Sequence, residues 1–199
     1  LQSCENVKLT AVADAFEDNA KLKAGQLREQ MPDKVDLPED RVFAGFDAYR
    51  KAIDSGVDMV ILATPPGFRP MHYQAAVAAG KHVFMEKPCC VDAPGFRMLM
   101  EANKIVDEKN LKVGVGLQRR HQASYLETLQ RVAEGAIGDL QYLRVYWNGG
   151  GVWNRARQAN QTEMEYQMRN WYYFVWLSGD HICEQHVHNL DVANWIKGA

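Results

Sequence analysis

Apolar residues in the first part of the chain form short runs that alternate with charged stretches of helical spacing. The expected strands cover 7–13, 57–63, 82–85 and 112–117, and the expected helices cover 18–31, 46–55, 70–79 and 95–109. The run at 57–63 is almost wholly apolar, which is typical of a central strand covered on both faces. Strands that alternate with helices of this length predict βαβ units, a parallel sheet and right-handed connections.

The pattern changes near Arg119. The expected elements are then a helix at 124–134, a half-exposed strand at 140–147, a long loop at 148–170 and a helix at 182–197. Alternation at 140–147 favours an antiparallel sheet, and long loops that carry glycine and aromatic residues are usually functional. The sequence therefore predicts two domains, at 1–118 and 119–199, the second being the start of an α/β domain.

Composition excludes several classes of protein. The 199 residues are 47% hydrophobic and 24% charged with a net charge of −2, which gives no electrostatic case for binding nucleic acid or an anionic membrane. No apolar run approaches the roughly 18 residues that span a bilayer. Four scattered cysteines form no disulfide framework, so we expect free thiols and a cytoplasmic location. Because the sequence does not begin with Met, an exported form stays open.

The stretch Gly80 to Pro88 (GKHVFMEKP) is the most informative in the chain. A predicted strand ends there in Glu86, Lys87 and Pro88. The carboxyl ends of parallel strands are where open α/β sheets bind ligands. Glu86 and Lys87 point to opposite sides of the pleat, so one of them faces the ligand directly. The alternative is an ordinary solvated strand end.

Asp14 ends the first expected strand. In a dinucleotide-binding fold, an acid at such a position binds the ribose hydroxyls about 20 residues after the first glycine of the phosphate loop. Only thirteen residues precede Asp14, and the chain contains no GxGxxG. Either the fold binds no dinucleotide or the sequence is a fragment; for Asp14 alone, a helix cap is the simpler interpretation.

Four segments together resemble the Gfo/Idh/MocA oxidoreductases, which include glucose–fructose oxidoreductase and inositol dehydrogenase. They are VKLTAVADAF (7–16), VDMVILATPPGFRPMHYQAAVAAGKHVFMEKP (57–88), VGVGLQRRH (113–121) and GAIGDL (135–140). The resemblance implies a Rossmann-type parallel sheet followed by an α/β domain with an open antiparallel sheet. It also implies that the first strand with its glycine loop, and most of the second sheet, are missing here.

The resemblance also assigns residues to the cofactor. Asp14 matches the ribose-binding acid, which favours NAD over NADP because a 2′-phosphate would meet a carboxylate. The other positions expected beside the cofactor are Thr64, Pro65, Pro66, His72, Glu86 and Lys87.

At the reacting hydroxyl, the resemblance places Lys87 and His188. The family's second domain usually carries Asp-x-x-x-His with the histidine as proton acceptor, and here Glu184 stands in the aspartate's place. On one helix, residues four apart share a face, so Glu184 is expected to orient His188. Arg119, Arg169 and Trp171 are expected to contact a sugar or polyol, and Trp176 to pack in the core of a domain interface.

This chemistry predicts an NAD-dependent oxidoreductase that moves hydride between a secondary hydroxyl of a carbohydrate or polyol and nicotinamide. Histidine is the natural base near neutral pH, and a lysine can stabilise the developing alkoxide. Three alternatives stay open: a redox-neutral NAD-dependent glycosidase, a non-catalytic scaffold, and a metal site formed by His181, Glu184 and His188. We expect no metal, no membrane or nucleic-acid partner, and a homo-oligomer (dimer or tetramer).

Overall fold

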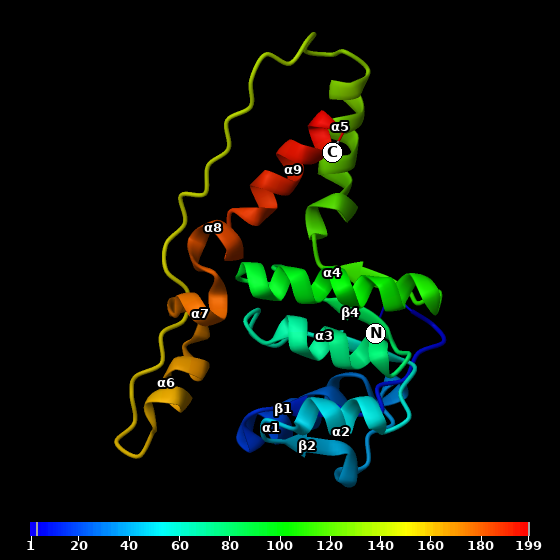
Figure 1. Ribbon diagram of the computed structural model, residues 1–199, viewed down its shortest axis with the longest axis vertical. Helices are drawn as coiled ribbons and strands as arrows, with labels where there is room; N and C mark the ends of the chain where they lie inside the picture. The colour runs from blue at the N-terminus through cyan, green and yellow to red at the C-terminus, as the bar shows by residue number, and fades with distance from the viewer. Residues whose placement is uncertain (3, 199) are drawn as a thin grey trace. The chain divides into compact units, whose positions relative to one another are not determined.

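The computed structural model describes residues 1–2 and 4–198, and Figure 1 labels most of their helices and strands. The chain forms two compact units, each built from several segments. The first unit contains residues 1–64, 71–84 and 98–113, and the second contains 65–70, 85–97 and 114–198. Each unit is described by itself.

The first unit contains a parallel pair of strands, β1 (Val12–Asp14) and β2 (Val42–Ala44), joined in the register Val12 to Val42. Helices α1 (Glu17–Gln30) and α2 (Ala48–Asp54) both pack against this pair. The buried face of α1 carries Ala20 and Ala24, small residues that let the helix approach the strands closely. Two short 3₁₀ turns, Pro32–Lys34 and Glu39–Arg41, connect α1 to β2.

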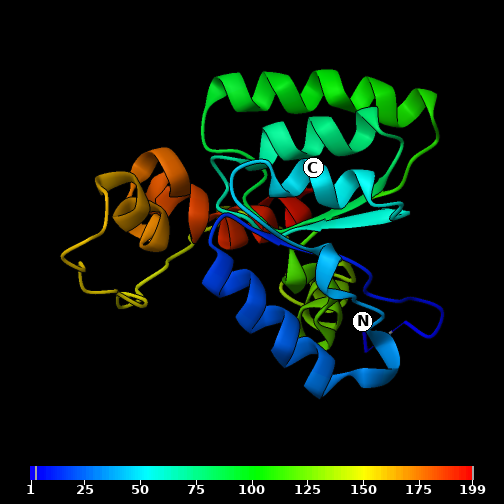
Figure 2. The same ribbon diagram turned by 90° about the horizontal axis from the view of Figure 1, so that it is seen from below.

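The second sheet has the order β3 (Met59–Leu62), β4 (His82–Met85), β5 (Val113–Val115), with α3 (Arg69–Ala78) and α4 (Ala93–Glu108) as the connections. The Val83 N–H donates to Lys112 O at 3.0 Å, and the Gly116 N–H donates to Met85 O at 2.8 Å. Both strands therefore advance in the same direction, which makes β4 and β5 parallel. In Figure 2, α2 (cyan) and α3 (teal) lie on one side of the strands and α1 (blue) on the other.

These βαβ units confirm the predicted fold class, an α/β protein with Rossmann-type parallel sheets. Strand β4 has the predicted bounds, and seven other elements differ from the predicted ones by one or two residues at each end: α1, α2, α3, α4, β3, β5 and a helix of the second unit, α5 (Ala123–Ala133). The first strand is shorter than predicted, because residues before Val12 make only an isolated bridge from Leu9 to Val35.

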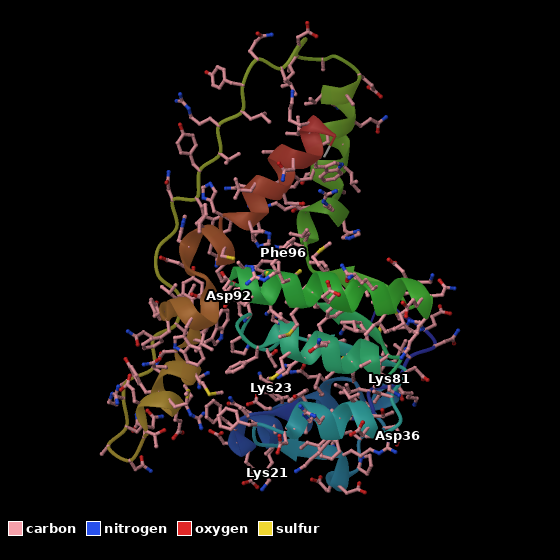
Figure 3. The ribbon with its side chains drawn as sticks, viewed as in Figure 1. Lys21, Lys23, Asp36, Lys81, Asp92 and Phe96 are labelled. Atoms are coloured by element: carbon pink, nitrogen blue, oxygen red, sulfur yellow. The ribbon has the colours of Figure 1, made fainter. Side chains whose placement is uncertain are left out.

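The second unit is mainly helical. Its elements after β5 are a 3₁₀ turn (Gln118–His121), α5 (Ala123–Ala133), α6 (Glu163–Arg169), a second 3₁₀ turn (Trp171–Tyr173), α7 (Val175–Ser178), α8 (Asp180–Glu184) and α9 (Val187–Lys197). Helices α5 and α9 pack together, as do α7 and α8. Asp92, labelled with Phe96 in Figure 3, caps the start of α4 by accepting a hydrogen bond from the Gly95 N–H at 2.6 Å.

Three sequence-based expectations are wrong. Residues 140–147 form no strand, because within the described part of the chain no neighbouring strand accepts their backbone hydrogen bonds. The helix expected at 182–197 is two helices, α8 and α9, which break at Gln185 and His186. Strand β3 is not covered on both faces, since Met59 and Ile61 are exposed. Separately, no helix among the described residues is long and apolar enough to cross a membrane.

Candidate active site

The carboxyl end of β4 places Lys87 in the second unit, against α8. Its Nζ donates to Glu184 Oε1 at 2.8 Å and also to the backbone carbonyl of Glu184. The side chains are 13% and 8% exposed, so this is a buried ion pair. Glu184 Oε2 is also buried and has no hydrogen-bond partner among the described residues. Part of this carboxylate is thus available to a further donor.

The Glu86 carboxylate lies against Gly116, the residue that follows β5. A Cβ atom at Gly116 would collide with the Glu86 carboxylate, so the absence of a side chain at this position makes room for it. Glu86 and Lys87, which follow β4, therefore occupy different environments, one beside Gly116 and the other beside Glu184, as expected from the alternation of side chains along an extended chain.

His188 lies in the first turn of α9 and is buried, with 5% of its surface exposed. Its imidazole stacks on the Trp147 ring, with centroids 5.9 Å apart and planes 23° from parallel. The pKa of His188 is lowered to about 4, chiefly by burial and also by the positive charges of Lys87 and Arg119, while Asp191 opposes the shift. The imidazole is therefore neutral at pH 7 and free to accept a proton.

Arg119 lies beside the same imidazole and is held in place from two sides. Its Nη1 donates to Asn189 Oδ1, and its guanidinium lies over the rings of Tyr125 and Trp147, 5.3 and 5.5 Å from their centroids. Asn189 in turn donates to Tyr146 O at 2.6 Å. The structure thus brings Lys87, Glu184, His188 and Arg119 together in one compact unit.

The expected orientation of His188 by Glu184 is wrong. The two residues lie on different helices, α8 and α9, and the Glu184 carboxylate binds Lys87. The break lies between the two residues: α8 ends at Glu184, Gln185 departs from ideal helical geometry with φ −109°, and α9 begins at Val187. The imidazole of His188 stacks on Trp147, and this contact orients the ring where Glu184 was expected to do so.

The predicted cofactor residues Asp14, Thr64 and His72 lie in the first unit. Asp14 Oδ1 accepts from the Phe16 N–H at 2.8 Å, so the residue does close the turn between β1 and α1. His72 Nδ1 lies 3.2 Å from Thr64 Oγ1, and its ring stacks on Tyr49 at 4.1 Å. Burial lowers the pKa of His72 to about 4, which keeps this ring neutral.

The turn residues Pro65 and Pro66 belong to the second unit and lead into α3. Pro65 O accepts from the Phe68 N–H at 3.0 Å and Pro66 O from the Arg69 N–H at 3.3 Å. The next residue, Gly67, donates to Leu177 O at 2.9 Å, which ties this turn to the helical part of the same unit.

Arg169 ends α6 and Trp171 begins the 3₁₀ turn that follows, apart from the contacts of Lys87 and His188 described above. Arg169 Nε donates to Glu165 Oε1 at 3.0 Å, and Trp171 packs against Trp153 with centroids 5.6 Å apart. Trp176 is 44% exposed, and its packing at a domain interface stays a prediction. Within the described residues no group of three or more His, Cys, Asp or Glu side chains is arranged to hold a metal ion.

Comparison with known proteins gives the chain its family. Residues 2–117 match the profile of the Gfo/Idh/MocA oxidoreductase family, NAD-binding Rossmann fold. The chain belongs to this family. It is 31% identical over 155 residues to scyllo-inositol 2-dehydrogenase (NADP⁺) of Bacillus subtilis, covering 78% of this chain and 40% of that protein.

Other known proteins resemble most of the chain. Inositol 2-dehydrogenase of Rhizobium meliloti is 24% identical over 97% of this chain and 48% of its own length. The crystal structure of aldose-aldose oxidoreductase from Caulobacter crescentus superposes with a TM-score of 0.66 at 21% identity, covering 99% of this chain and 52% of that one. The chain spans about half the length of these proteins.

Reasoning from the sequence missed two residues of this candidate site. Trp147 was expected only as the last residue of the strand at 140–147, and nothing in its spacing singles it out as the partner of His188. Arg69 was not considered at all, although its two bonds hold the backbone around Lys87. The available signal was a cation at the first position of a helix, where the helix dipole disfavours it.

Proposed function

We propose that this chain forms part of an NAD(P)-dependent oxidoreductase that transfers hydride between a secondary hydroxyl of a polyol or sugar and nicotinamide. Its membership in an oxidoreductase family supports the reaction class. The names of its relatives, several of them inositol 2-dehydrogenases, support a cyclic polyol as the substrate. The observation that carries the proposal is the buried ion pair of Lys87 and Glu184, in which the Lys87 charge acts on a neutral, buried His188.

The residues of the first unit fit a dinucleotide. Asp14 ends β1 and engages only Oδ1 in a hydrogen bond among the described residues, which leaves Oδ2 to accept from ribose hydroxyls. Relatives are named for both NADP and NAD. The carboxylate at position 14 supports NAD, because a 2′-phosphate placed there would be repelled. The cofactor, when bound, supplies the hydride acceptor.

His188 and Lys87 divide the work at the substrate hydroxyl. The neutral imidazole accepts the hydroxyl proton at a ring nitrogen, and stacking on Trp147 keeps the ring plane fixed while it does so. The Lys87 ammonium stabilises the negative charge that develops on the substrate oxygen. Glu184 holds Nζ through its carboxylate and its carbonyl, so the ammonium does not have to be ordered during the reaction.

The test is an absorbance assay of the purified protein with NAD or NADP and a panel of scyllo-inositol, myo-inositol and aldoses. The proposal expects net NADH or NADPH formation with at least one polyol. Cleavage of a chromogenic glycoside that needs NAD but releases no NADH would instead establish the redox-neutral glycosidase. Absence of both activities, with NAD bound, would favour a non-catalytic role. The predicted homo-oligomer is checked on the same preparation by analytical ultracentrifugation.

A further inference from the structure

Arg69 is the first residue of α3 and is almost completely buried, with 3% of its surface exposed. Its Nη1 donates to Glu86 O at 2.8 Å and to Pro88 O at 2.6 Å. These two carbonyls lie on either side of Lys87 in the sequence. All of these residues belong to the second unit. One guanidinium group therefore holds the backbone immediately before and after the lysine.

This arrangement is costly for the fold. Burial lowers the pKa of Arg69 to about 10, still well above neutrality, so a charged group is held away from water. The positive end of a helix disfavours a cation at its first residue. Arg69 Nε is buried without a hydrogen-bond partner among the described residues, which adds a further cost. An apolar residue would avoid these three costs but could not hold Glu86 O and Pro88 O, so contact with these two carbonyls is what the arginine provides here.

We propose that Arg69 is a positioning residue that fixes the peptide planes around Lys87 and so aims its ammonium at the substrate oxygen. This inference rests on the proposed role of Lys87. The carbonyls of Glu86 and Pro88 are fixed by Arg69, and Nζ is fixed by Glu184. The lysine is thus held at both its backbone and its charged end. A misplacement of about 1 Å at a reacting group can lower turnover about 10²-fold.

The kinetic test replaces Arg69 by Ala and by Lys. Arg69→Ala should lower kcat about 10- to 100-fold with a smaller change in the KM for cofactor, and guanidinium added to the assay should restore part of the loss. Arg69→Lys keeps the charge but lacks the planar fork, so it should retain more activity than alanine and less than arginine. The proposal would be overturned if Arg69→Ala changed the cofactor KM as much as it lowered kcat, and guanidinium restored none of the lost activity.

Arg28 provides a matched control in the first unit. It donates through Nε and Nη2 to Leu37 O at 3.1 and 2.7 Å, so it too holds a backbone carbonyl. Arg28→Ala should change thermal stability without the drop in kcat, and guanidinium should have no effect on it. Equal loss of kcat in Arg28→Ala and Arg69→Ala would reduce the role of Arg69 to general stability.

A second readout does not depend on turnover. Lys87 should react slowly with acetic anhydride, and mass spectrometry can follow its modification relative to exposed Lys104. Arg69→Ala should raise the relative rate at Lys87 at least about threefold, whereas Arg28→Ala should leave it unchanged. An unchanged rate in a folded Arg69→Ala or Arg69→Lys protein would overturn the positioning role. Faster labelling without any oxidoreductase activity would support positioning while refuting the proposed function.

Discussion

Removing the Lys87 ammonium should destabilise the second unit strongly. Lys87→Met keeps the approximate length of the side chain but leaves the Glu184 carboxylate buried, with neither Oε1 nor Oε2 bonded to a cation. Deleting one partner of a buried ion pair typically costs about 3–5 kcal/mol. The cost has a ceiling, because a carboxyl group can take up a proton instead; at pH 7 this requires about 3.7 kcal/mol for an ordinary glutamate. We therefore expect a loss of about 3–4 kcal/mol at pH 7.

Urea unfolding followed by circular dichroism measures this loss. The double substitution Lys87→Met with Glu184→Gln removes the stranded charge and should recover a large part of it. The exposed pair of Lys104 and Glu101, 2.7 Å apart, is the control, and Lys104→Met should cost less than about 1 kcal/mol. Equal costs for Lys87→Met and Lys104→Met, or no recovery in the double variant, would refute the assignment of a buried, mutually dependent pair.

Three further predictions concern other parts of the chain. In the folded protein, His72 and His188 have pKa values of about 4, below the ordinary 6.5, so the unfolded chain binds more protons at acid pH. Each histidine should therefore lower the free energy of unfolding by up to about 3 kcal/mol as the pH falls from 6.5 to 4. His72→Asn should flatten this pH dependence in urea titrations. Asp14→Ala should weaken NAD binding while changing NADP binding less, as calorimetry would report; tighter NAD binding would contradict the ribose role. Gly116→Ala should destabilise by about 1–3 kcal/mol because its methyl group meets the Glu86 carboxylate, and Glu86→Ala in the same protein should relieve the loss.

The parallel α/β part of the fold could be predicted because its information is local. Alternating periods of two and 3.6 residues, with Gly80 closing α3 and a lysine and proline ending β4, define each element without reference to distant residues. The same reasoning failed for residues 140–147, because alternation describes a strand only if another strand is present to pair with it.

The site could be predicted only in part, for a similar reason. Lys87 and Glu184 are 97 positions apart, and no periodicity reveals that one binds the other. The spacing of Glu184 and His188 predicted a shared helical face, but α8 ends at Glu184 and a new helix, α9, begins at Val187. Partners brought together by tertiary packing, such as Trp147 beside His188, follow from the folded chain alone.

The measurement that tests the central claim most directly is the turnover of His188→Asn and Lys87→Ala with the polyol that supports NADH formation. The account predicts that each variant loses at least about 100-fold in kcat, the usual scale for an acid–base or electrostatic group, while calorimetry finds cofactor binding within about threefold of the original protein. Near-normal turnover by either variant, in protein that remains folded, would contradict the claim that these two residues act together on the reacting hydroxyl.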